Sequence, residues 1–223
     1  MNQKNPTKIF YQQRVFIFLV AKRLIDFFGS LFLLVLFSPI LLVCAALIKL
    51  GSPGPIIFKQ RRVGEGHEFF MYKFRSMYVG DMDKFLREKY PDLWEKYKKA
   101  DWKLPANEDP RITPIGKFIR ATSIDEMPQF VNVLKGEMSM VGPRAYREEE
   151  LQEYEKNYPQ CKENIKIIRT AKPGITGLWQ TSGRNSLNFE KRAQLDASYI
   201  VNRSLRQELH ILLKTPFAML SRW

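Results

Sequence analysis

The sequence has few of the residues that build disulfide frameworks, metal sites or histidine-based catalytic groups. Its 223 residues include two cysteines and two histidines. Cys44 lies inside an apolar run and Cys161 in a charged segment, so the pair does not predict a disulfide and is typical of a reducing compartment. His67 and His210 have no partners at the spacing of metal ligands or catalytic residues, which indicates surface or packing roles.

Acidic residues are missing from the N-terminal end. No Asp or Glu precedes Asp26, and the formal net charge of the whole chain is +13. The basic residues before and after the apolar run are Lys4, Lys8, Arg14, Lys22, Arg23, Lys49, Lys59, Arg61, Arg62, Lys73 and Arg75. Clusters of this kind beside an apolar segment favour an anionic membrane surface. Nucleic acid is not predicted as a partner, because recognition-helix, zinc-ligand and RNP patterns are all missing.

Residues 27–48 carry no charged side chain, and as a straight helix they would reach about 33 Å, enough to cross a bilayer core. Ser38-Pro39 falls near the middle, where proline removes a helical hydrogen bond. Basic flanks on both sides place both ends on the cytoplasmic face. A re-entrant helix-break-helix satisfies both facts, and a kinked spanning helix is the alternative that the residues leave open.

The chain is predicted to divide into an N-terminal basic and membrane segment, 1–50, and a cytosolic catalytic domain, 51–223. The fold class is α+β, mainly helical, with a small β-hairpin around Gly64-Glu65-Gly66. Residues 81–103 form a charged helical insertion, one or two helices broken at Pro91, and are a candidate interaction element. Residues 205–223 predict a pair of interfacial amphipathic helices interrupted at a proline, or else core packing.

Two adjacent carboxylates, Asp125 and Glu126, are the main candidate for chemistry, with Arg120, Lys135 and Arg144 nearby in the sequence. An ionised aspartate is a competent nucleophile on phosphorus once cations neutralise the anionic target. Two carboxylates can divide the tasks, one attacking and one holding Mg²⁺. Residues 123–126 also match the S-x-x-E capping box, so a helix cap is the structural alternative, and the two interpretations are compatible.

Two other functions are alternatives to chemistry on phosphorus by the carboxylate pair. Asp81-Met82-Asp83 resembles the DxD metal motif of conventional glycosyltransferases, which would release UDP, but the strands of that fold are not predicted around it. A non-catalytic membrane-anchored scaffold, in which the carboxylate pair only caps a helix, is the second alternative. Trp179 could stack on uracil, although core packing is the simpler interpretation.

Several motifs occur in a fixed order along nearly the whole chain, from about Lys22 to Leu213. They are Lys22-Arg23-x-x-Asp26, Ser38-Pro39, Gly54-Pro55-x-x-Phe58-Lys59-Gln60, Tyr72-Lys73-Phe74-Arg75-Ser76-Met77, Asp109-Pro110-Arg111-Ile112-Thr113, Asp125-Glu126, Val141-Gly142-Pro143-Arg144, and residues 173–180 with Gly183-Arg184-Asn185. In this order the chain resembles the bacterial sugar transferases, or monotopic phosphoglycosyl transferases. Each motif is weak alone, and the ordered set is specific.

The resemblance implies transfer of a sugar 1-phosphate from a UDP-sugar to undecaprenyl phosphate, with release of UMP and dependence on Mg²⁺. It implies a re-entrant hairpin and a site on the cytoplasmic face of the bacterial inner membrane. Asp125 would be the nucleophile that forms a phosphosugar-aspartate intermediate, and Glu126 would bind Mg²⁺ with it or assist proton transfer. The residues that would bind substrate are Lys73, Arg75, Arg120, Arg144, Gln180, Arg184 and Asn185.

The chain departs from the family pattern at Ala145, where a proline is usual, which puts the local turn in question. The insertion at 81–103 resembles that of hexose-1-phosphate transferases, so galactose or glucose is expected, in the first membrane step of O-antigen, capsule or exopolysaccharide synthesis. Expected partners are the UDP-sugar, undecaprenyl phosphate and anionic lipids. A homodimer is left open, with 81–103 as the candidate contact.

Overall fold

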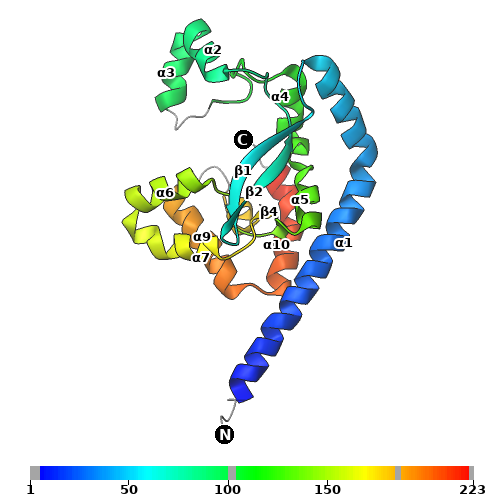
Figure 1. Cartoon of the computed structure of the whole chain (residues 1–223), viewed down its shortest axis with the longest axis vertical. Helices are drawn as coiled ribbons and strands as arrows, with labels where there is room; N and C mark the ends of the chain where they lie inside the picture. Colours follow the sequence, from blue (N-terminus) through cyan, green and yellow to red (C-terminus); the bar gives the residue numbers. More distant parts are fainter. Residues whose placement is uncertain (1–5, 100–103, 184–186, 221–223) are drawn as a thin grey trace. The chain divides into compact units, whose positions relative to one another are not determined.

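The computed structural model describes residues 6–99, 104–183 and 187–220. Over these residues the chain is mainly helical, with two small two-stranded sheets (Figure 1). The elements in chain order are α1 (Pro6–Gly51), β1 (Ile57–Gly64), β2 (His67–Phe74), α2 (Met82–Lys89), α3 (Pro91–Lys99), α4 (Pro114–Ala121), the 3₁₀ helix η1 (Ile124–Glu126), α5 (Gln129–Lys135), β3 (Ser139–Val141), α6 (Glu148–Asn157), the 3₁₀ helix η2 (Pro159–Cys161), α7 (Lys162–Arg169), β4 (Gly174–Thr176), α8 (Leu178–Thr181), α9 (Phe189–Asn202) and α10 (Leu205–Leu220). The predicted mainly helical fold with a small β-hairpin is confirmed.

Helix α1 is long and apolar. Within its segment Val15–Gly51 an 18-residue window has a mean hydropathy of 3.0, and 11% of that window is buried. By length and composition this helix could cross a membrane. The helix is continuous through Pro39, where the sequence predicts an interruption. Proline removes one hydrogen-bond donor, and a helix can absorb that loss without ending. The structure is thus compatible with membrane association, and the two-arm hairpin stays a prediction.

The residues gather in two compact units, which are described separately. The first comprises Met1–Val35, Gln60–Met71 and Gln129–Trp223, and the second comprises Leu36–Lys59 and Tyr72–Pro128. Helix α1 and the hairpin of β1 and β2 each contribute residues to both units. The predicted boundary after residue 50 concerns the membrane and stays a prediction.

The first unit is built around β3 and β4, two short parallel strands. Ser139 pairs with Gly174, and Val141 pairs with Thr176. All three residues of β3 are buried. Tyr199 of α9 packs against Val141, and its hydroxyl donates a hydrogen bond of 3.0 Å to the Val141 carbonyl. Strand β3 is therefore buried, and its contacts fix the position of the segment that follows it.

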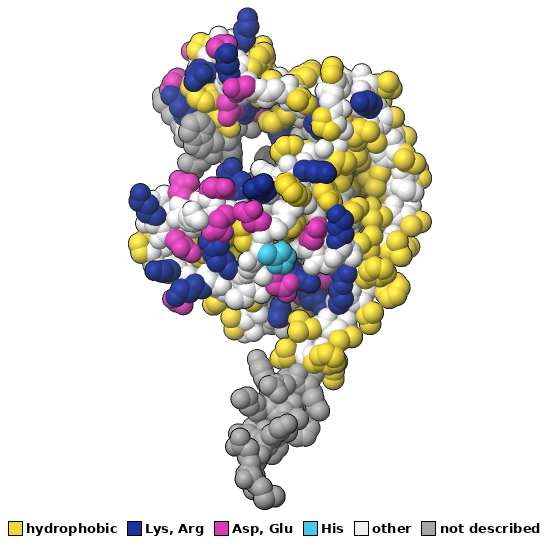
Figure 2. All heavy atoms as spheres, in the orientation of Figure 1, with side chains coloured by type: hydrophobic (Ala, Val, Ile, Leu, Met, Phe, Trp, Pro, Cys, Tyr) yellow, Lys and Arg dark blue, Asp and Glu magenta, His cyan; other side chains and the backbone are white. Residues whose placement is uncertain are grey.

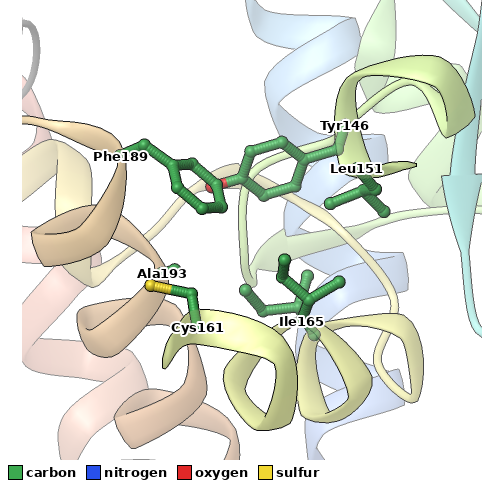
Figure 3. Close-up of a cluster of buried hydrophobic side chains, with 7 residues drawn as sticks. Tyr146, Leu151, Cys161, Ile165, Phe189 and Ala193 are labelled. Carbon is green, nitrogen blue, oxygen red and sulfur yellow. The ribbon is translucent and has the colours of Figure 1, made fainter. Parts of the chain in front are cut away.

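A helical core completes the first unit by joining α6, η2, α7 and α9. Its buried members are Tyr146, Leu151, Cys161, Ile165, Ile168, Phe189 and Ala193 (Figure 3). Tyr154 stacks on Phe189, with ring centroids 3.6 Å apart and planes inclined by 15°. Tyr146 meets the same ring edge-on, at a centroid distance of 6.3 Å. Aromatic contacts of this kind add to the energy of burial, and here they fix α9 against the segment after β3.

Two charged residues on α1, Lys22 and Asp26, join this helix to the rest of the first unit. The Lys22 ammonium pairs with Glu208 of α10 at 2.6 Å and donates to the Val141 carbonyl at 2.9 Å. One Asp26 oxygen accepts the main-chain N–H of Met140 at 2.9 Å. These groups are largely buried, so removing one partner would leave a buried charge uncompensated, which is strongly destabilising.

In the second unit the C-terminal end of α1 packs into a small apolar core. Cys44 and Ile48 are buried there with Phe74 and Ile119, and Ile124 of η1 is packed against them. The short helix η1 carries the predicted catalytic carboxylates. Its position is therefore set by packing against the apolar helix itself.

The insertion predicted at residues 81–103 forms two helices, α2 and α3, separated at Pro91 as the sequence predicts. Residues 100–103 lie outside the described residues. The buried guanidinium of Arg111 pairs with Asp83 of α2 at 2.7 Å. This ion pair ties the insertion to the Asp-Pro-Arg loop.

Helix α10 differs from the predicted pair of helices. It is a single helix that runs through Pro216. One side of it is buried, at Glu208 and Ile211. The other side exposes Leu213 and Phe217. Core packing is therefore shown for one side of the helix, and the interfacial role stays a prediction. Residues 221–223 lie outside the described residues.

Gly142 supplies a test of the β3–β4 pairing. A Cβ at this position would lie 2.6 Å from the Gly174 nitrogen and 2.6 Å from the Lys172 carbonyl oxygen, which are main-chain atoms that cannot move aside. We expect Gly142→Ala to lower the free energy of unfolding by about 1–3 kcal/mol or more, through overpacking. Thermal unfolding of the detergent-purified protein measures the loss. Gly51→Ala is the matched control, because its nearest contact would be an ordinary 3.8 Å; equal stability of the two variants would contradict the account.

Candidate active site

Asp125 and Glu126 lie in η1, directly after a strained residue. Ser123 has a left-handed backbone conformation, with φ of 56°. Non-glycine residues in this conformation cost about 1 kcal/mol or more and cluster at functional sites. The Ser123 side chain makes no capping hydrogen bond. The capping-box interpretation is therefore wrong for this segment, because Glu126 makes an ion pair instead of closing the box.

The carboxylate cluster, as we call Lys73, Arg120, Asp125 and Glu126, lies within the second unit. Lys73 of β2 donates to Glu126 Oε1 at 2.7 Å. Arg120 is held from the side by a 2.9 Å hydrogen bond from its Nε to the hydroxyl of Ser76. The structure thus brings together four of the residues that the sequence predicts, two cations and two carboxylates.

Burial sets the protonation of this cluster. Burial and, second to it, the adjacent Glu126 charge raise the pKa of Asp125 to about 6, against the opposing effects of Lys73 and Arg120. Burial also lowers the pKa of Arg120. Desolvation disfavours the charged form of each group, and opposite charges restore it. A pKa of about 6 leaves the Asp125 carboxylate mostly ionised at neutral pH, with cations beside it.

The donor set fits a magnesium ion that is shared with a substrate. In the part of the chain that the structure describes, no group of three or more His, Cys, Asp or Glu side chains could hold a metal. Mg²⁺ typically uses one or two protein carboxylates and completes its shell with water and substrate phosphates. Asp125 and Glu126 meet that requirement, and a closed all-protein cage is not needed.

Arg75 has a different environment from the one expected of a phosphate-binding residue. Its guanidinium is buried and donates to the main-chain carbonyls of Ile48, at 3.2 Å, Ser52, at 2.7 Å, and Pro53. These contacts fix the turn that follows α1. The structure thus gives Arg75 a structural role, and its predicted substrate contact has no support in these bonds.

The acidic residues of the Asp81-Met82-Asp83 motif also have structural contacts. Asp81 caps the N-terminus of α2 by accepting the N–H of Lys84 at 2.9 Å. Asp83 pairs with Arg111. A cap and an ion pair account for both carboxylates, so nothing in the described chain supports a glycosyltransferase metal motif here.

The other predicted substrate-binding residues belong to the first unit. Arg144 and Arg192 both lie against the indole of Trp179, with guanidinium-to-centroid distances of 5.6 Å and 4.9 Å. Trp179 is buried, so it packs as the simpler interpretation predicted. Gln180 donates to the Ile175 carbonyl at 3.3 Å. Arg184 and Asn185 were also predicted here, and they lie outside the described residues.

Asp196 is a buried acid of this unit that the sequence did not reveal as a site residue. It is 0% exposed, and it accepts the main-chain N–H of Arg144 at 3.1 Å and the hydroxyl of Tyr146 at 3.4 Å. Burial raises its pKa to about 7, against these two hydrogen bonds and the charges of Arg144 and Arg192. The signal that could have found it is its place on α9 between Ala193 and Ala197, on the apolar face of the helix.

Comparison with known proteins identifies the family. The model of the bacterial sugar transferases matches residues 17–222. The exopolysaccharide production protein ExoY of Rhizobium meliloti is 40% identical over 208 residues, which cover 91% of this chain and 87% of that protein. An uncharacterized sugar transferase of Haemophilus influenzae is 42% identical over 207 residues, covering 91% of this chain and 41% of its own length. The undecaprenyl-phosphate galactose phosphotransferase of Salmonella typhimurium is 40% identical over 204 residues, 90% of this chain and 40% of its own.

The chain belongs to the bacterial sugar transferase family, and the resemblance predicted from its motifs is confirmed. It spans about two fifths of the length of the Haemophilus and Salmonella relatives. The family assignment places the carboxylate cluster in a transferase.

The pKa of Asp196 predicts how stability depends on pH. The folded pKa of about 7 lies above the reference value of 3.8, so the folded protein binds a proton that the unfolded chain releases. The stability that this proton provides is present below the unfolded pKa and is lost as the pH rises through about 7. Asp196→Asn does not titrate, so its melting temperature relative to wild type should increase between pH 5.5 and 8.5. A difference that is constant or falls with pH would show that Asp196 is ionised throughout.

Proposed function

We propose that the protein transfers a hexose 1-phosphate, with galactose or glucose as the sugar, from a UDP-sugar to undecaprenyl phosphate and releases UMP. The names of two relatives support this choice of substrates: the galactose phosphotransferase described above, and the UDP-glucose:undecaprenyl-phosphate glucose-1-phosphate transferase of Escherichia coli, 37% identical over 204 residues. The pathway would be exopolysaccharide, capsule or O-antigen synthesis. The observation that carries the proposal is the half-buried Asp125 beside the Lys73–Glu126 ion pair and Arg120.

In the first step the ionised Asp125 carboxylate attacks the phosphorus that carries the sugar. A bond forms between an aspartate oxygen and this phosphorus, and the bond to the bridging oxygen of the diphosphate breaks. The electron pair leaves with UMP, so no proton transfer is needed at the nucleophile. In the second step an oxygen of undecaprenyl phosphate attacks the same phosphorus and releases Asp125. Enzymes use a carboxylate nucleophile in this way to divide one difficult transfer into two easier steps.

The cations of the cluster lower the barrier by neutralising charge. Lys73 and Arg120 lie where a diphosphate must approach two carboxylates, which would otherwise repel it. Mg²⁺, held by Asp125 and Glu126, would supply further positive charge to the phosphate oxygens. Glu126 forms an ion pair with Lys73 at 2.7 Å, and in the proposed reaction it serves as a metal ligand or as a proton acceptor. Arg144, Gln180, Arg184 and Asn185 are proposed to contact the donor, with Arg144 the strongest candidate because of its charge.

Replacing the nucleophile tests the reaction class. We expect Asp125→Asn to reduce UMP release by at least about a thousandfold, because the amide cannot form the covalent intermediate. The assay uses detergent-purified protein, Mg²⁺, undecaprenyl phosphate and a panel of UDP-sugars. Asp81→Asn is the matched control and should retain turnover, since Asp81 only caps α2. Release of UDP that depends on Asp81 would favour a conventional glycosyltransferase, and activity retained in Asp125→Asn would remove Asp125 as nucleophile.

We propose that α1 is embedded in the cytoplasmic face of the inner membrane without crossing it. Its exposed apolar side chains gather along the helix, as the yellow side chains of Figure 2 illustrate. In the first unit Lys22 and Asp26 bind the globular chain, and in the second Cys44 and Ile48 pack in its core. Globular contacts at both ends of the apolar stretch support a monotopic placement, since a spanning helix would carry one end to the far side. The exposed face of α10 and the basic flanks would then meet anionic lipid headgroups.

Cysteine labelling tests this placement. In a background without Cys44 and Cys161, single cysteines at Lys8 and Lys59 lie on the two sides of the apolar stretch. An impermeant maleimide should label both in inverted membrane vesicles and neither in intact cells, because both flanks face the cytoplasm. Labelling of either position from the outside of intact cells would establish a spanning helix.

A further inference from the structure

The segment that carries Arg144, residues 142–146, has no regular secondary structure, yet its main chain is fixed at every residue. The contacts, all within the first unit, are Gly142 N–H to the Thr176 carbonyl at 2.9 Å, Gly174 N–H to the Pro143 carbonyl at 2.9 Å, Arg144 N–H to Asp196 at 3.1 Å, Arg62 to the Ala145 carbonyl at 2.9 Å, and Val63 N–H to the Tyr146 carbonyl at 2.9 Å. The contact at Arg144 is the one among these five that a carboxylate makes. The N–H that Asp196 accepts is that of Arg144, the residue predicted to bind the substrate.

Asp196 holds the surroundings of the Arg144 side chain as well as its main chain. The guanidinium lies 5.7 Å from the ring centroid of Tyr146, and the hydroxyl of that ring donates to the same Asp196 oxygen at 3.4 Å. The guanidinium also lies over Trp179. One buried carboxylate therefore sets the origin of the Arg144 side chain and the orientation of an aromatic ring beside it.

The choice of an acid at position 196 needs a reason beyond packing. The side chain is fully buried, its other oxygen has no hydrogen-bond partner among the described residues, and neither Arg144 nor Arg192 forms an ion pair with it there. A buried carboxylate without an ion pair is costly, whereas an apolar residue or an asparagine would be cheaper in a purely structural place. What Asp196 does in this structure is hold the Arg144 segment.

We propose that Asp196 is a positioning residue for Arg144, acting through the Arg144 N–H and the Tyr146 hydroxyl. The inference rests on the proposed function, in which Arg144 contacts the UDP-sugar. Asp196 itself does not touch the substrate. Its loss should therefore weaken donor binding more than it slows the chemical step, which is a signature that general destabilisation does not produce.

The test compares steady-state kinetics of the full-length protein with the UDP-sugar as the varied substrate. We expect Asp196→Ala to raise KM about tenfold with kcat within about threefold, because the guanidinium is no longer held in one position. Asp196→Asn keeps an oxygen that accepts the same bonds and should keep KM within about twofold of wild type. Should the alanine variant not fold, Tyr146→Phe removes the second bond alone and should raise KM about threefold.

A double-mutant cycle shows whether Asp196 acts through Arg144. The double variant Asp196→Ala/Arg144→Ala should bind the donor no more weakly than Arg144→Ala alone, because the residue being positioned is already gone. Asp26→Ala is the matched control, since Asp26 is another buried acid of the first unit that holds a main-chain N–H, that of Met140. It should lower the melting temperature and leave KM within about twofold.

The outcomes separate the inference from the proposal beneath it. If Asp196→Ala lowers kcat at constant KM, if Asp26→Ala raises KM equally, or if the double variant is weaker than Arg144→Ala, the positioning role is overturned while the transferase reaction stands. An unchanged KM in Arg144→Ala overturns the donor contact of Arg144 and the inference with it. Calorimetry can measure UDP-sugar affinity when the same variants are made in an inactive Asp125→Ala background. Differences in affinity that persist there would show that the effect lies in donor binding.

Discussion

The desolvation of adjacent carboxylates, balanced by nearby cations, is the constraint on which the account of this protein depends. Asp125 and Glu126 are consecutive in the chain, so their charges repel each other wherever the turn is placed. Partial burial adds to that cost and raises the pKa of Asp125. Lys73 and Arg120 offset it, one by a direct ion pair with Glu126 and one by its charge. In the proposed reaction the same four groups would supply the nucleophile and the cations that neutralise a diphosphate, so the electrostatic cost of the cluster and its proposed chemistry come from the same residues.

A related principle organises the first unit, where buried carboxylates hold main-chain N–H groups around β3. Asp26 of α1 binds Met140, and Asp196 of α9 binds Arg144. Carboxylate-to-amide hydrogen bonds are stronger than neutral ones, which suits them to fixing short segments that lack a long sheet for support. Close approach of β3 and β4 at Gly142 and Gly174 completes the fixation. These contacts fix the position of Arg144, the charged residue of the Val141-Gly142-Pro143-Arg144 motif.

The sequence predicted those features that depend on local pattern. The turn Glu65-Gly66, with φ of 52° and 80°, and the separation of α2 from α3 at Pro91 follow from local residue preferences. The sequence located the turn of the hairpin but not the length of its strands, and β1 includes the charged residues Arg61 and Arg62. Helices α1 and α10 continue through Pro39 and Pro216, where the sequence predicts interruptions, and the re-entrant hairpin at Ser38-Pro39 stays a prediction.

Features that depend on tertiary contacts could not be read in the same way. The S-x-x-E pattern predicted a cap, but Glu126 forms an ion pair with Lys73 of β2, which is far from it in the sequence. Arg75 lies in a motif with Lys73, but it follows the end of β2, and its guanidinium donates to main-chain carbonyls at and after the end of α1. Asp196 carries no local signal beyond its place on an apolar helix face. Charge, proximity and spacing located the carboxylate cluster, whereas the roles of individual arginines required the fold.

The most direct measurement of the central claim is mass spectrometry of the protein after incubation with a UDP-sugar and Mg²⁺, without undecaprenyl phosphate. The account predicts an added hexose phosphate on the peptide that contains Asp125, released when undecaprenyl phosphate is supplied. Turnover that needs both substrates together, with no adduct on the protein at any time, would contradict covalent catalysis by Asp125.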